Sequence, residues 1–266
     1  MRYLERGGVR LAWDESGSGV PILLIMGHRY SSAMWYPVFE AFGGRNHLMW
    51  FDNQGTGQSG ARKRTSVREM ADDALAVLDA AGVDSAHVYG VSMGGGIALE
   101  FGIRYPERTR SLILGCTMAK TPEFAAKRSW IHWVIYHLPT PILKALGSKK
   151  YNRGYGDAAP EDRIQADLAK LAKDPFSRKG VWAQAVAISD YSVEPDAVRA
   201  MTKPALVLHG TQDLAVPYEQ GKKLSEMLPS ARLVTFEDTG HNYFVAHGDR
   251  ANAEVERFIA EVEKTR

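Results

Sequence analysis

The stretch that decides the fold is HVYGVSMGGG, residues 87–96. It begins as a short apolar run, typical of a strand covered on both faces, and continues as a helix-like segment. Gly90, Ser92 and Gly94 form a G-x-S-x-G pattern, which indicates a strand-to-helix turn too sharp for side chains at the two glycines. Such a turn presents the serine hydroxyl at the positive end of the helix, where developing negative charge is favoured. The stretch therefore predicts Ser92 as a nucleophile.

Asp213 is the candidate acid that would support it. The pattern around Ser92 is weak by itself, because its three fixed residues occur together by chance in roughly one chain in ten. An apolar run at 205–209 (ALVLH) leads into GTQD, which places Asp213 at the carboxyl end of a strand, where sites of open parallel sheets gather. Glu237 and Asp238 are rivals, but they precede the histidine loop and resemble turn residues.

His241 is the candidate general base. It follows the run at 232–236 (RLVTF), and the order serine, aspartate, histidine along the chain is the one that this kind of turn predicts. The other histidines fall mostly in strand-like, helical or helix-start positions, where a packed or exposed histidine is ordinary. They are His28, His47, His87, His132, His137, His209 and His247.

Short apolar runs alternate with helical patterns along the chain. The runs lie at 21–26, 47–51, 87–91, 110–114, 205–209 and 232–236, and helical spacing appears at 67–81, 224–228 and 255–262. This alternation predicts βαβ crossovers and a mostly parallel sheet.

The alternation stops between Met118 and Met201, a stretch too long for a simple crossover. Helical patterns at 129–138 and 161–173 predict an inserted helical cap there. We therefore expect an α/β core made of residues 1–118 and 201–266, with a cap at 119–200.

Composition limits the partners and cofactors. The 266 residues are 45% hydrophobic and carry a net charge of +2 without a long basic block, so nucleic acid is not expected as a partner. Cys116 is the single cysteine, and no zinc-ligand spacing or phosphate loop is visible, so neither a metal nor an organic cofactor is expected. Without a signal-like stretch or about 18 uninterrupted apolar residues, we expect a cytoplasmic protein with no membrane partner.

Four motifs together resemble the α/β-hydrolase superfamily, in its esterase, enol-lactone hydrolase and cofactor-free haloperoxidase-like branch. They are FDNQGTGQS at 51–59, GVSMGGG at 90–96, GTQDLAVP at 210–217 and GHNYF at 240–244. The resemblance covers nearly the whole chain and implies the α/β-hydrolase fold, with a mostly parallel eight-stranded sheet flanked by helices. It is specific for the fold and the catalytic triad of Ser92, Asp213 and His241, but not for the substrate.

The resemblance also implies the oxyanion donors and a pocket. Met26, Gly27 and His28 stand where the family usually has His-Gly before the first donor, so the backbone NH groups of His28 and Met93 are the expected oxyanion hole. The expected substrate-pocket residues are Arg29, Tyr30, Trp35, Trp130, Trp133 and Phe244.

The expected activity is hydrolysis of a small-molecule carboxylic ester through an acyl-enzyme. A lactone, an enol lactone or a carbon-carbon bond could be cleaved by the same triad, and a non-catalytic small-molecule receptor is the alternative of another class. A dehalogenase is disfavoured, because its nucleophile is an aspartate where this chain has Ser92.

Overall fold

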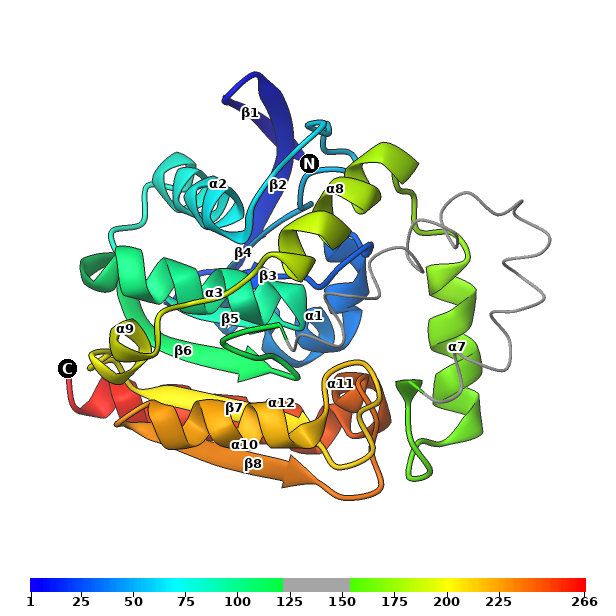
Figure 1. Ribbon diagram of the computed structural model, residues 1–266, viewed down its shortest axis with the longest axis vertical. Coiled ribbons are helices and arrows are strands. Elements are labelled where there is room, and N and C mark those ends of the chain that lie inside the picture. The colour runs from blue at the N-terminus through cyan, green and yellow to red at the C-terminus, as the bar shows by residue number, and fades with distance from the viewer. Residues whose placement is uncertain (122–153) are drawn as a thin grey trace.

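The computed structural model describes residues 1–121 and 154–266, which are built around an eight-stranded sheet (Figure 1). The strands are β1 (Arg2–Arg6), β2 (Val9–Ser16), β3 (Val20–Ile25), β4 (Asn46–Phe51), β5 (Ala86–Val91), β6 (Thr109–Gly115), β7 (Ala205–Gly210) and β8 (Ala231–Phe236). Their order across the sheet is β1-β2-β4-β3-β5-β6-β7-β8. Strand β2 alone runs opposite to the other seven strands, so the sheet is mostly parallel, as predicted.

The six expected apolar runs are confirmed as β3 to β8. Strand β5 shows why: its six residues are all buried, and alternate side chains enter opposite cores, with Val88 on one face and Tyr89 and Val91 on the other. Strands β1 and β2 were not expected. They lie at one edge of the sheet, where exposed polar side chains interrupt the apolar pattern that marks the central strands.

Helices cover both faces of the sheet (Figure 1). One face packs on α2 (Val67–Ala80), α3 (Met93–Arg104) and α10 (Tyr218–Met227), and the other on α1 (Tyr36–Phe42) and α12 (Gly248–Lys264). Short helical turns lie at η1 (Ser32–Trp35), η2 (Pro106–Arg108) and α11 (Tyr243–Ala246). Helix α2 begins at a capping box, in which the hydroxyl of Ser66 accepts the backbone N–H of Glu69 at 3.1 Å.

Between β6 and β7 the described residues form α7 (Glu161–Leu171), α8 (Arg178–Ser189) and α9 (Pro195–Arg199). Helix α7 matches the helical pattern at 161–173, whereas α8 and α9 were not expected, and the pattern at 129–138 lies outside the described residues. The start of α8 packs closely on the loop after β4, because a Cβ on Gly180 would lie 2.3 Å from the Cα of Gly55.

The strand order creates one position suited to a ligand. Strand β3 lies between β4 and β5. The connection from β3 leads to β4 on one side, and the connection from β4 then leads to β5 on the other side of β3. In open parallel sheets, ligands bind outside the carboxyl ends of the strands at such a switch point. The loop after β3 and the turn after β5 meet there. Within the described ranges, no helix has the length and apolar character needed to cross a membrane.

Candidate active site

Ser92 occupies a strained turn between β5 and α3. Its backbone angles are φ 56° and ψ −122°, a region that residues other than glycine rarely adopt and that is concentrated at functional sites. A Cβ on Gly90 would lie 2.0 Å from the carbonyl oxygen of Gly94, and a Cβ on Gly94 would lie 2.0 Å from that of Ile25. Both glycines are therefore required by close backbone approach, which is the reason the sequence pattern predicted.

Hydrogen bonds hold this turn in place. The N–H of Ser92 donates to the carbonyl of Gly115 at 2.7 Å, and the hydroxyl of Thr117 donates to the carbonyl of Ser92 at 2.8 Å. The backbone of Ser92 is thus anchored to the end of β6, while its side chain remains partly exposed.

Asp213 and His241 form a hydrogen-bonded pair at the same edge of the sheet. Asp213 follows β7 and His241 follows β8, and their Oδ2 and Nδ1 atoms lie 2.7 Å apart. The other carboxylate oxygen of Asp213, Oδ1, accepts the backbone N–H groups of Ala215 and Val216 at 2.8 and 2.9 Å. A carboxylate can only accept from a neutral imidazole N–H, so this contact fixes the proton of neutral His241 on Nδ1 and leaves Nε2 as the basic nitrogen.

The charges of the pair are mutually supporting. Burial by itself raises the pKa of the Asp213 carboxyl, but the charge of His241 and the hydrogen bonds from His209 and His241 hold that pKa well below its usual range. Burial by itself lowers the pKa of His241, but the Asp213 carboxylate outweighs it and raises that pKa above its ordinary value. The pair can therefore take up a proton on His241 while Asp213 stays ionised.

His209 is a second histidine at Asp213, although its place in a strand-like run favoured an ordinary packed histidine. Its buried Nε2 lies 2.9 Å from the carbonyl of Val216 and 3.3 Å from Oδ2 of Asp213. Both partners accept, so Nε2 carries the proton. Its position at the end of β7, four residues before Asp213, was the available signal.

The loop after β3 lies against Ser92. A Cβ on Gly27 would lie 3.2 Å from the Cβ and 3.9 Å from the Oγ of Ser92, so the chain passes directly beside the serine. The Nε2 of His28 donates to the carbonyl of Val181 at 3.0 Å. His28, Ser92 and Met93 line the same cavity.

This Ser92 cavity has a volume of about 170 Å³ and a largely apolar lining. Besides His28, Ser92 and Met93, its described walls are Val67, Gly96, Thr117, Met118, Thr121, Ala185, Ile188, Ser189, Tyr191, Ala215 and Val216. The hydroxyls of Thr117, Thr121, Ser189 and Tyr191 each donate to a backbone carbonyl. The walls contributed by α8 and by residues 117–121 were not predicted, because their approach to Ser92 depends on how the chain folds back between β6 and β7.

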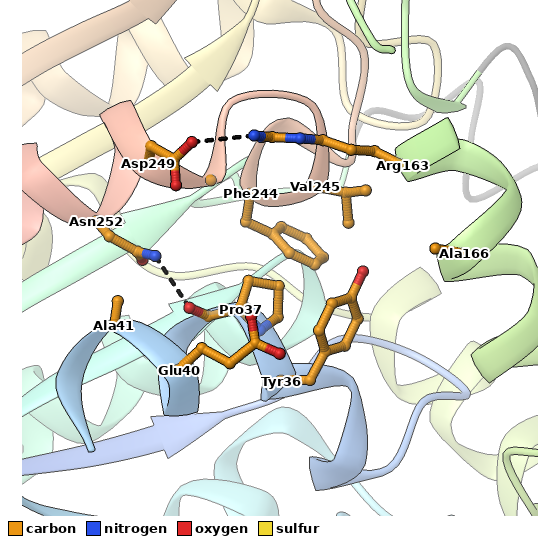
Figure 2. A pocket seen from close by; sticks show the side chains of 11 residues that line it. Tyr36, Pro37, Glu40, Ala41, Arg163, Ala166, Phe244, Val245, Asp249 and Asn252 are labelled. Carbon is orange, nitrogen blue, oxygen red and sulfur yellow. Dashed lines mark hydrogen bonds and ion pairs between the residues drawn. The ribbon is translucent and has the colours of Figure 1, made fainter. Parts of the chain in front are cut away.

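Two expected pocket residues lie elsewhere. Trp35 is fully buried in the core, with its ring centroid 4.8 Å from that of Tyr89. Phe244 lines a separate cavity of about 400 Å³ and lies near Tyr36 and Pro37 there (Figure 2). The positions of Trp35 and Phe244 therefore do not support the expected substrate contacts. From the sequence alone, an aromatic residue that packs in the core cannot be told from one that lines a pocket.

The other expected pocket residues are only partly placed. Arg29 and Tyr30 follow His28, and the Arg29 guanidinium lies over the rings of Tyr30 and Phe176, 5.6 and 4.8 Å from their centroids. Neither residue is among the described walls of the Ser92 cavity. Trp130 and Trp133 lie outside the described residues.

Comparisons with known proteins agree with this architecture. The sequence model of the family described as serine aminopeptidase, S33, matches residues 21–246. The chain is 28% identical over 273 residues to a 2-hydroxymuconate semialdehyde hydrolase of Pseudomonas putida, which covers 98% of this chain and 95% of that protein.

Solved structures share the fold. A thermophilic esterase of Thermogutta terrifontis superimposes with a TM-score of 0.85 at 23% identity, covering 98% of this chain and 99% of that one. The enol-lactonase of Burkholderia xenovorans LB400 gives 0.82 at 22% identity, covering 97% and 100%. With a family match over most of its length, this chain belongs to the S33 family of α/β-hydrolases and is a hydrolase.

Proposed function

We propose that this hydrolase cleaves a carboxylic ester through an acyl-enzyme, with Ser92 as nucleophile, His241 as general base and Asp213 as the orienting acid. The observation that carries the proposal is the 2.7 Å bond between His241 Nδ1 and Asp213 Oδ2, at the sheet edge where the strained turn presents Ser92. This bond leaves His241 Nε2 as the proton acceptor that an attacking serine hydroxyl requires.

The proposed reaction follows from these roles. The Oγ of Ser92 attacks the ester carbonyl carbon as His241 takes the hydroxyl proton, and Asp213 stabilises the imidazolium that results. The backbone N–H groups of His28 and Met93 would donate hydrogen bonds to the carbonyl oxygen and stabilise the negative charge that develops on it. His241 returns the proton to the leaving alcohol. Water then attacks the acyl-enzyme while His241 takes its proton, and His241 passes that proton to the Oγ of Ser92 as the carboxylic acid leaves.

The Ser92 cavity bears on the substrate. A dry apolar cavity of about 150 Å³ holds one benzene-sized group, so about 170 Å³ fits a short acyl chain or a small ring. The four wall hydroxyls that bond to backbone carbonyls leave a mostly apolar surface, which favours a hydrocarbon group over a charged one. A small lactone is the second candidate, because its ring ester meets the same size limit.

The test is hydrolysis of p-nitrophenyl esters from acetate to decanoate, alongside small lactones, by wild type and Ser92→Ala. We expect turnover that depends on Ser92, peaks at about six acyl carbons or fewer, and falls as the chain outgrows the cavity. Retention of more than a few percent of turnover in Ser92→Ala would refute the assigned nucleophile.

Other outcomes separate the alternatives. Turnover confined to lactones would move the substrate class to ring esters while keeping the triad. Rapid labelling of Ser92 by an organophosphonate without turnover of any ester or lactone would favour a carbon-carbon bond substrate. Absence of both labelling and turnover would favour a receptor.

A further inference from the structure

Gln184 on α8 connects the loop after β3 to the loop after β4. Its side chain is fully buried, and both halves of its amide are used. The Oε1 atom accepts the backbone N–H of Arg29 at 3.0 Å, and Nε2 donates to the carbonyl of Gln54 at 2.8 Å. One side chain from the segment between β6 and β7 thus fixes the backbone next to the proposed oxyanion donor His28.

The backbone at Arg29 needs such support. Its φ is 76°, in the left-handed region that is unfavourable for a residue with a Cβ. The N–H that Gln184 accepts belongs to the peptide between His28 and Arg29. Holding that peptide restricts rotation at His28, and therefore the direction of the His28 N–H in the preceding peptide.

Two neighbouring contacts act in the same direction. The side chain of His28 donates to the carbonyl of Val181, one helical turn before Gln184. The carboxylate of Asp174 accepts the N–H of Ser31 at 2.8 Å and also its hydroxyl. Residues 28, 29 and 31 are therefore all bonded to the segment 174–184, and Gln184 supplies the central contact.

We propose that Gln184 is a positioning residue that aims the backbone N–H of His28 at the developing oxyanion. The inference rests on the proposed function, because it concerns the same reaction at Ser92. Gln184 is not among the described walls of the Ser92 cavity, so it would act through the backbone of Arg29. Its loss should weaken stabilisation of the transition state more than binding of the substrate.

The test compares an ester with its thionoester, in which sulfur replaces the carbonyl oxygen. Sulfur is a weak hydrogen-bond acceptor, so thionoester turnover depends little on oxyanion donors. Removing one donor entirely costs roughly 10²–10³ in kcat. For Gln184→Met, which keeps the side-chain length but removes both bonds, we expect kcat for the ester to fall at least about tenfold with KM within about threefold. The ratio of ester to thionoester turnover should fall at least about fivefold.

The controls separate positioning from general damage. Gln184→Glu, with its buried carboxyl protonated, keeps an oxygen facing the N–H of Arg29 and an O–H donor facing the carbonyl of Gln54, and should retain the wild-type ratio within about threefold. Gln165→Met replaces an exposed glutamine on α7 that bonds to Glu161 and should leave the ratio unchanged. Because each ratio is measured on one preparation, it does not depend on the fraction of molecules that fold.

Two results would overturn the inference: an unchanged ratio in Gln184→Met, which includes an equal fall on both substrates, or a loss of ratio in Gln184→Glu as large as in Gln184→Met. Each of these requires ester turnover that Ser92→Ala abolishes. Turnover that survives Ser92→Ala would instead refute the proposed function, so the two failures are distinguishable.

Discussion

Replacing Asp213 with asparagine changes one oxygen to an NH₂ group, and the structure indicates which one. Oδ1 accepts two backbone N–H groups, from Ala215 and Val216, whereas Oδ2 faces His241 and His209. The amide oxygen should therefore stay with the backbone, because placing NH₂ there would oppose two donors. The NH₂ group would then donate to Nδ1 of His241, which moves the imidazole proton to Nε2.

That tautomer has no free nitrogen to accept the proton of Ser92. The same kind of substitution in a well-studied serine protease lowers kcat about 10⁴-fold, and we expect a comparable loss here. A factor of 10⁴ corresponds to about 5.4 kcal/mol of activation free energy. The NH₂ group would also face the Nε2–H donor of His209, and this pairing of two donors should further destabilise the site. The assay is kcat for p-nitrophenyl butyrate, measured with the thermal midpoint to confirm that the variant is folded.

The matched control is Asp238→Asn in the loop before His241. Asp238 is exposed and has a φ of 51°, a conformation that asparagine tolerates, so its replacement should change kcat less than about threefold. A loss of less than about tenfold in Asp213→Asn would refute the tautomer argument. A large loss in Asp238→Asn instead would make that carboxylate the acid.

Two further predictions concern pH and folding. Because the Asp213 carboxylate raises the pKa of His241, the protonated, inactive base should persist to higher pH, and kcat/KM should rise through a midpoint above 6.5 in a pH-rate profile; a midpoint well below 6.5 would contradict this. Gly94→Ala should lower the free energy of unfolding by about 3 kcal/mol, because its Cβ meets the carbonyl of Ile25, whereas Gly248→Ala, with 3.9 Å of clearance, should cost less than about 1 kcal/mol in the same denaturant titration. Equal losses in the two glycine variants would argue against the close approach.

The parts of the molecule predicted from sequence are those set by local chemistry. Strands β3 to β8 could be recognised because strands covered on both faces need continuous apolar residues. The turn at Ser92 could be recognised because only glycine fits at positions 90 and 94. Strands β1 and β2 escaped recognition, since exposed or partly exposed polar residues interrupt their apolar residues.

Only the tertiary structure decided the contacts between residues far apart in the chain. Trp35 was expected at the pocket and lies in the core. The sequence indicates that an aromatic ring is buried, but not whether it packs in the core or borders the substrate cavity. The contact of Gln184 with Arg29 joins residues 155 positions apart, and no local pattern encodes it. Sequence by itself determined strands β3 to β8, the glycine turn and the order of the chemical groups. The fold alone decided which side chains surround them, because that depends on how the segment between β6 and β7 packs over the loops after β3 and β4.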